Sequence, residues 1–137
     1  MPLTPLTTWK RTLIFNVEIP VTPVPAARPR VPRFGKPFYV GKYKDFRSQM
    51  DVWVADQQPT DLLEGPLTVH AEFICKRPAK PANPYPIGDI DNYLKAIWDS
   101  LQGRLYFRDD KQIETVHATK RFSQSANPRI LLTIEEN

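Results

Sequence analysis

Acidic residues gather in one stretch of this sequence. Five of the fifteen Asp and Glu residues lie between Gly88 and Gln112. They are Asp89, Asp91, Asp99, Asp109 and Asp110. Neighbouring carboxylates repel each other unless they are solvated, protonated or neutralised by a cation. Oxygen ligands without an accompanying His or Cys suit Mg²⁺ or Mn²⁺, which keep positions open for water and phosphate. The stretch therefore predicts metal-assisted phosphodiester hydrolysis, in which the metal polarises the phosphate and activates water.

A short helix is expected to position the first of these carboxylates. Asp89 and Asp91 open a segment with helical apolar periodicity, where a side-chain oxygen can cap backbone N–H groups and the helix dipole favours negative charge. The helix should therefore begin near Asp89. Its residues separate into an apolar stripe and a polar stripe. The apolar stripe holds Ile90, Leu94, Ile97, Trp98 and Leu101, and the polar stripe holds Asp91, Asn92, Lys95 and Asp99.

The end of this helix should bring a second acidic pair to the same place. Gly103 favours an end to the helix, and the segment RLYFR then leads to Asp109 and Asp110, ahead of a strand-like run. Three or four carboxylates can therefore converge. Lys95, one helical turn after Asp91, can add positive charge to the same site.

Each acidic residue also has an ordinary structural interpretation. Asp89 alone is typical of an N-cap, and the acidic pair ahead of the strand is typical of a turn. The spacing of Asp91, Lys95 and Asp99 is that of solvated ion pairs one helical turn apart. For any one of these features alone the structural interpretation is favoured, and only their combination favours a site.

The combination resembles the signature of a known family. The arrangement DxDNxxK, then Asp99, then DD ahead of a strand is similar to that of the RusA family of Holliday-junction resolvases, metal-dependent endodeoxyribonucleases of bacteria, their phages and prophages. The block PVPAARPR, followed by FYV and a Lys- and Tyr-rich helix, resembles the other recurrent block of the family. Together the two blocks cover much of the chain from about Pro23 onward. The Pro-rich entry PAKPANPYP and the ten-residue leader depart from the family pattern.

The resemblance also implies the site residues and the cofactor. Its catalytic positions correspond to Asp89, Asp91, Lys95 and Asp110. The three aspartates among them would bind the metal, with Asp109 as a further candidate ligand. The implied cofactor is Mg²⁺, with Mn²⁺ able to substitute, and the implied partner is branched DNA. Spacing alone supports only a metal-dependent phosphodiesterase that acts on nucleic acid.

Basic residues cluster in two stretches, one before and one at the end of the strand expected at residues 66–77. Between residues 28 and 47 they alternate with Phe34, Phe38, Tyr39 and Tyr43, a composition suited to a phosphate backbone and exposed bases. The alternative is a solvated basic loop whose aromatic residues anchor it to the core. The net charge of +4 includes the acidic cluster, so the remaining surface is more basic than the total implies. The candidate DNA-binding residues are Arg28, Arg30, Arg33, Lys36, Lys42, Lys44, Lys76, Arg77 and Lys80.

The 137 residues fit one domain, with residues 1–10 as a tail or lead-in and residues 11–137 as the endonuclease domain. Residues 12–19 and 66–77 alternate as strands, and residues 41–58 have helical periodicity. Residues 112–122 and 129–136 should form two further strands, joined as a hairpin through SQSANP. The order predicts an α+β fold, in which a mixed or mainly antiparallel sheet of about four or five strands packs against two helices.

The remaining reactive side chains give weaker indications. Cys75 is the only cysteine, which excludes an internal disulfide and fits a reducing cytosol. No apolar run approaches the length that spans a membrane, so we expect the cytosol of a bacterium or of a phage-infected host. His70 has no second His or Cys nearby in the sequence and is interpreted as a surface histidine. His117 is interpreted as structural.

The sequence thus favours a Mg²⁺-dependent, structure-selective endodeoxyribonuclease that resolves four-way junctions by paired, symmetric nicks. Resolution needs two nicks, and one acidic cluster cuts one strand, so we expect a homodimer. One alternative is a nuclease for another branched DNA, such as a flap or a fork. Another is a noncatalytic nucleic-acid-binding protein of the same fold, against which the complete set of acids and Lys95 argues.

Overall fold

The structure is a computed structural model that describes residues 13–39, 41–125 and 127–137. The helices and strands are β1 (Ile14–Ile19), α1 (Gly41–Ala55), β2 (Leu67–Cys75), α2 (Ile90–Leu101), the 3-10 helix η2 (Asp110–Gln112), β3 (Ile113–Phe122) and β4 (Arg129–Glu136). The expected α+β class, with two α-helices and a four-stranded mixed sheet, is confirmed. The tail or lead-in expected at residues 1–10 lies outside the described residues.

The sheet has the strand order β1-β4-β2-β3. β4 pairs antiparallel with both β1 and β2, whereas β3 pairs in parallel with β2 at the edge. The predicted hairpin between β3 and β4 is therefore wrong. Ile130, Leu132 and Ile134 of β4 are at most 2% exposed, which suits a central strand, while most side chains of β3 are exposed. Because α2 crosses over between β2 and β3, these two strands run parallel.

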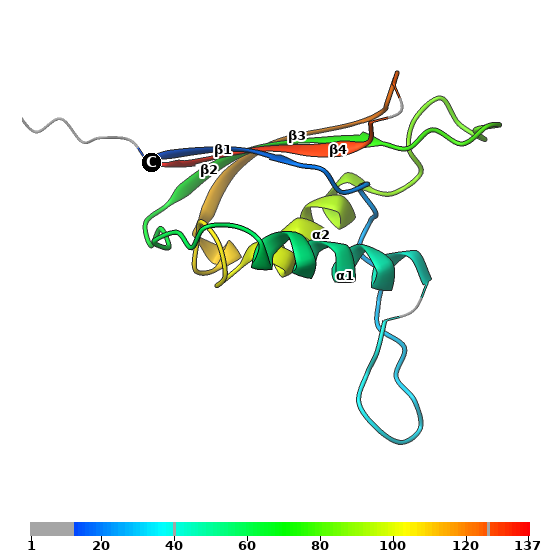
Figure 1. Cartoon of the computed structure of the whole chain (residues 1–137), viewed down its shortest axis with the longest axis horizontal. Coiled ribbons are helices and arrows are strands. Elements are labelled where there is room, and N and C mark those ends of the chain that lie inside the picture. The colour runs from blue at the N-terminus through cyan, green and yellow to red at the C-terminus, as the bar shows by residue number, and fades with distance from the viewer. Residues whose placement is uncertain (1–12, 40, 126) are drawn as a thin grey trace, which may run out of the picture.

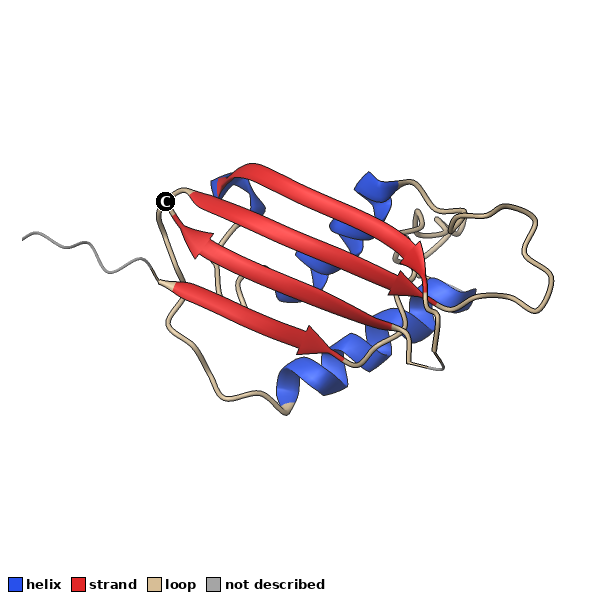
Figure 2. Ribbon diagram, turned by 90° about the horizontal axis from the view of Figure 1, so that it is seen from above, coloured by secondary structure: helices blue, strands red, loops and turns tan. Residues whose placement is uncertain are grey.

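Both α-helices cover the same face of the sheet, and no helix of the described residues lies on the opposite face (Figure 1, Figure 2). Phe46 and Met50 of α1 and Ile97 and Leu101 of α2 share one buried cluster with Phe73 of β2. The helical periodicity predicted for α1 is confirmed by this burial. In α2 the buried face is rotated from the predicted stripe: it includes Tyr93, Ala96 and Ser100, whereas Ile90, Leu94 and Trp98 are only partly buried. Within the described ranges, no helix is both long and apolar enough to cross a membrane.

Two histidines lie together on the face of the sheet that has no helix. His70 of β2 and His117 of β3 are partners in the strand register, and their rings stack with centroids 4.6 Å apart and planes inclined by 12°. His70 is exposed, as predicted for a surface histidine, although His117 lies beside it in space. Parallel pairing of the two strands aligns residues that are far apart in the sequence, so inspection of local spacing cannot find the pair.

Candidate active site

The entry to α2 is tightly packed. Gly88 lies where a Cβ atom would come within 2.7 Å of side-chain atoms of Pro25 and Tyr93, so only glycine fits without displacing them. Lys120 of β3 donates hydrogen bonds from Nζ to the carbonyl oxygens of Pro86, at 2.8 Å, and Gly88, at 2.6 Å. Pro25, Tyr93 and Lys120 therefore all restrain the backbone just before Asp89, the first candidate ligand.

The carboxylate of Asp89 is not used to cap the helix. Asp89 is the N-cap of α2 by position, but its side chain makes no capping hydrogen bond. Its backbone carbonyl instead accepts from the N–H groups of Asn92, at 3.0 Å, and Tyr93, at 3.3 Å. The expected side-chain cap is therefore wrong, and the Asp89 carboxylate is exposed alongside that of Asp91. Both residues are therefore positioned by the start of α2, and the Asp89 carboxylate is not used in helix capping.

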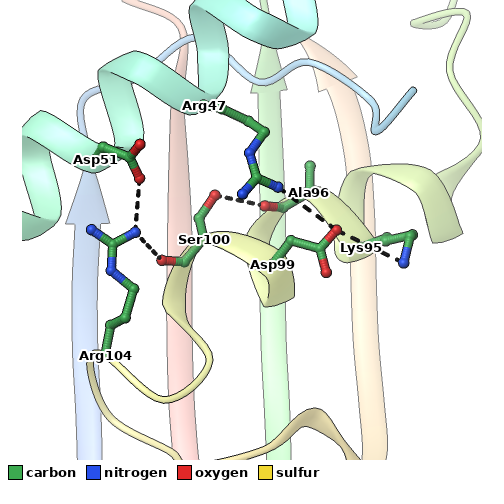
Figure 3. A network of polar contacts seen from close by, with 7 residues as sticks. All are labelled: Arg47, Asp51, Lys95, Ala96, Asp99, Ser100 and Arg104. Carbon is green, nitrogen blue, oxygen red and sulfur yellow. Dashed lines mark hydrogen bonds and ion pairs between the residues drawn. The ribbon is translucent and has the colours of Figure 1, made fainter. Parts of the chain in front are cut away.

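Lys95 and Asp99 form the ion pair that their spacing predicts, with Lys95 Nζ 3.8 Å from Asp99 Oδ2. The same oxygen lies 4.0 Å from Nη1 of Arg47, which comes from α1 (Figure 3). The Lys95 side chain is 66% exposed, compared with 27% for that of Asp99. The middle of α2 therefore presents a solvent-facing ammonium group beside a partly shielded carboxylate.

The second acidic pair is anchored to the end of α2. Asp109 caps η2, because its carboxylate accepts from the backbone N–H of Lys111 at 2.9 Å. Gln112 completes this capping box by accepting from the Asp109 N–H at 2.8 Å, and it donates to the carbonyl oxygen of Leu63. The Asp110 N–H donates to a side-chain oxygen of Gln102, just after α2. These bonds position the pair through the Asp109 carboxylate and the backbone N–H groups of Asp109 and Asp110.

The electrostatics show which charged groups lie near one another. Partial burial raises the pKa of the Asp110 carboxyl, and so do its hydrogen bond with Asp109 and the negative charges of Asp109 and Asp99, while the Lys95 ammonium opposes the rise. The pKa of Asp109 is lowered, first by the hydrogen bond from the Lys111 backbone. The charges of Asp99, Asp109 and Lys95 thus all act on the Asp110 carboxyl, and its ionised form is disfavoured on balance.

The three carboxylates that the sequence assigns to a metal do not all meet in the single chain. Within residues 13–39, 41–125 and 127–137, no three His, Cys, Asp or Glu side chains are close enough to hold a metal ion together. Asp110 lies near the middle and end of α2, whereas Asp89 and Asp91 lie at its start. The donor chemistry still fits Mg²⁺, which takes one or two carboxylates and fills its other positions with water or phosphate oxygens.

All nine candidate DNA-binding residues are exposed. Six of them lie between residues 28 and 44, in the loop after β1 and the first turn of α1, and three lie in the loop after β2. Because β1 and β2 both pair antiparallel with β4, they point the same way, and both loops leave the sheet at the same end (Figure 1). Backbone hydrogen bonds between Arg30 and Phe38 close the first loop, and Phe34 at its tip is 84% exposed. This end of the molecule therefore offers both basic and aromatic contacts.

Two basic residues near the acids were not predicted to lie at this site, although Arg47 belongs to the basic stretch of residues 28–47 that was predicted to suit DNA. Arg47 reaches Asp99 from α1, and Lys120 reaches Gly88 from β3. The sequence does contain one signal for Lys120, because it occupies an inward position between Ala118 and Phe122 of an alternating strand. A lysine at such a position needs buried polar partners. Nothing in local spacing indicates the contact of Arg47, which depends on how α1 packs against α2.

Comparison with known proteins places the chain among the endodeoxyribonucleases. The family model of endodeoxyribonuclease RusA matches residues 20–135, which include both basic loops, α2 and the second acidic pair. The protein therefore belongs to the RusA family, which confirms the resemblance of its motifs. It is also similar to the uncharacterized protein YqaN of Bacillus subtilis (strain 168), with 26% identity over 109 residues, or 69% of this chain and 75% of that protein.

Proposed function

We propose that this protein is a Mg²⁺-dependent endonuclease that resolves four-way DNA junctions by paired nicks. The observation that carries the proposal is the acidic group around Asp110, whose carboxyl is influenced by the charges of Asp109, Asp99 and Lys95. The exposed ammonium of Lys95 lies 3.8 Å from Asp99 Oδ2. Such an acidic group is disfavoured on its own and is stabilised by a divalent cation. Membership of the RusA family supports the same activity.

The candidate ligands are Asp89, Asp91 and Asp110, with Asp109 as a further candidate. Because they do not all meet, one or two of these carboxylates would bind the metal directly, and water or phosphate oxygens would fill its other positions. When bound there, the metal would supply polarisation of the phosphate and a more acidic coordinated water. Mn²⁺, with similar ligand preferences, should substitute. Lys95 places a positive charge where negative charge develops on the phosphate oxygens during attack. The protein surface nearby excludes neither water nor DNA, since Asp89, Asp91 and Lys95 are all exposed.

The basic loops would bind the arms of the DNA. Six basic side chains between residues 28 and 44 and three between residues 76 and 80 lie at the end of the sheet where α2 begins. Phosphate contacts from such residues provide sequence-independent affinity. Because a junction must be cut twice, we propose a homodimer with one acidic site in each subunit. Sedimentation that shows only monomer, both free and on DNA, would contradict the dimer. The buried, free thiol of Cys75 fits a reducing compartment, and we propose the cytosol.

A comparison of DNA substrates tests this function. The purified protein is incubated with a four-way junction, a fork, a flap and a linear duplex of matched sequence, in Mg²⁺ and in excess EDTA. We expect paired, symmetric nicks on the four-way junction in Mg²⁺ and no nicks in EDTA, and Asp110→Asn serves as the inactive control. Preferential cutting of the flap or fork would assign another branched substrate. Binding without any cutting would identify a noncatalytic DNA-binding protein.

A further inference from the structure

Two arginines connect the two helices, and only one of them lies beside Lys95. Arg47 of α1 approaches the Asp99 oxygen that also faces Lys95, at 4.0 Å and 3.8 Å respectively. Arg104, just after α2, donates to Asp51 of α1 at 2.8 Å. Figure 3 shows Lys95 on the side of Arg47 and away from Arg104. The two arginines thus make similar connections between the helices in different chemical surroundings.

Aromatic rings hold the guanidinium of Arg47 in place. Its Cζ atom lies 5.0 Å from the centroid of the Tyr39 ring and 5.9 Å from that of Tyr43. The Arg47 side chain is 30% exposed, so it still reaches solvent. A guanidinium stacked on aromatic rings is preorganised, and less conformational freedom is lost when it binds an anion. Its five N–H donors form a fixed fork, and one ion pair at 4.0 Å leaves donors for a second anion.

Arg47 and Lys95 form a pair of cations around one carboxylate. A phosphodiester resembles that carboxylate in carrying one negative charge shared between two oxygens, and arginine binds both kinds of group strongly. We propose that Arg47 and Lys95 together bind the phosphodiester that is cut, so that Arg47 is a second cationic residue of the active site. Asp99 keeps the two cations adjacent before DNA arrives. The inference rests on the proposed endonuclease function.

The competing explanation is that Arg47 only connects α1 to α2, as Arg104 does. Arg47→Met and Arg104→Met are therefore a matched pair, because each removes one guanidinium and one contact between the helices. A purely structural role predicts that both variants lose stability and behave alike on DNA. A role in phosphate binding predicts that only Arg47→Met changes the interaction with DNA.

The first measurement is binding to a four-way junction without divalent metal, over a range of salt concentrations. Each lost phosphate contact should reduce the log–log salt slope by about 0.9. We expect this reduction for Arg47→Met and about 1.8 for the double variant Arg47→Met/Lys95→Met. The slope for Arg104→Met should equal that of the wild type. An unchanged slope for folded Arg47→Met would overturn the inference.

The second measurement is the single-turnover nicking rate at saturating enzyme with Mg²⁺. Loss of a group that stabilises developing charge should slow Arg47→Met about 100-fold, while Arg104→Met should stay within about 3-fold of the wild type. Equal rates for the two variants would overturn the inference. If the wild type binds the junction but cuts no DNA, the proposed function fails. In that case a reduced slope for Arg47→Met still supports the phosphate contact, and an unchanged slope overturns it.

A milder substitution keeps the test decisive if Arg47→Met does not fold. Arg47→Lys preserves one positive charge but loses the fork that binds two oxygens at once. We expect its salt slope to match the wild type and its nicking rate to fall about 10-fold, which is a loss of about 1.4 kcal/mol in transition-state stabilisation. Wild-type nicking by Arg47→Lys would overturn a role for the fork in binding the phosphate.

Discussion

The ammonium nitrogen of Lys120 lies 2.6 Å from the carbonyl oxygen of Gly88, the residue immediately before Asp89. Lys120 belongs to β3, and the second acidic pair immediately precedes this strand. β3 is therefore linked to both acidic groups. It follows Asp110 in the sequence, and its Lys120 side chain holds the backbone just before Asp89. The relative placement of the two groups depends on this strand as well as on α2.

Lys120→Met should weaken metal binding more than DNA binding. The substitution removes two hydrogen bonds to the backbone that leads into Asp89, and loss of such supporting contacts typically costs about 10-fold to 100-fold in metal affinity. We expect the Mg²⁺ concentration for half-maximal nicking to rise at least about 10-fold. Arg121→Met, on the same strand but paired with Glu72, is the control. An unchanged Mg²⁺ requirement in folded Lys120→Met would show that Lys120 has no part in the site.

Asp91→Asn should separate DNA binding from cleavage. The change keeps the shape of the side chain and removes the charge that would hold a cation, so metal-free binding to a junction should be as tight as in the wild type or tighter. Nicking in Mg²⁺ should be at least ~100-fold slower, a barrier increase of about 2.7 kcal/mol. Gel-shift titration and single-turnover kinetics measure the two effects. Near-normal cleavage by the folded variant would remove Asp91 from the site.

Asp110→Asn should make the metal-free protein more stable at neutral pH. The pKa of this carboxyl is raised in the folded protein, so its ionised form is disfavoured there, and the amide removes that cost. The advantage should shrink as the pH falls through the raised pKa and vanish near pH 3, where the wild-type carboxyl is protonated in both states. Thermal unfolding at several pH values tests this, with exposed Asp61→Asn as the control. Mg²⁺ should stabilise the wild type and not Asp110→Asn, and equal stabilisation would contradict the assignment.

Neutralising the loop after β1 should reduce the salt dependence of DNA binding. If Arg28, Arg30, Arg33 and Lys36 each contact one phosphate, replacing all four by Gln should lower the log–log salt slope by about 3.6. Replacement of Arg121 and Arg129, whose side chains are already paired with Glu72 and Glu18, should leave the slope unchanged. The slope is measured by fluorescence anisotropy with a labelled junction. A slope unaffected by the loop variant would place the DNA surface elsewhere.

The local pattern of apolar residues predicted the helices and strands, because each of these elements buries one face. The apolar period of α2 places Ile97 and Leu101 in the core, and the alternation in β1 places Ile19 in the core and packs Val17 against it. Gly103 ends the helix region as predicted, since the chain there has a φ of +72°, which glycine adopts at little cost. These features depend only on neighbours within a few residues.

Pairing between distant segments could not be predicted in the same way. Sequence proximity favoured a hairpin of β3 and β4, but the apolar side chains of β4, such as Leu132, are buried best between two strands. The stacking of His70 on His117 and the approach of Arg47 to Asp99 follow from that arrangement and from helix packing. The acidic motif could be recognised in the sequence. That Asp89 and Asp91 lie at the start of α2, and Asp110 near its middle and end, could be seen only in the folded structure.

The central position of β4 also has a consequence for biosynthesis. β1 and β2 do not pair with each other. Each pairs with β4, whose residues follow those of β1 by more than a hundred positions in the chain. Closing such long loops is entropically costly, and folds with many distant contacts form slowly. The sheet therefore cannot be completed on the ribosome until residues 129–136 have emerged. Until then the acidic residues of the nascent chain lack the complete sheet that supports them. The acidic residues therefore gain the support of the complete sheet only after β4 has joined it.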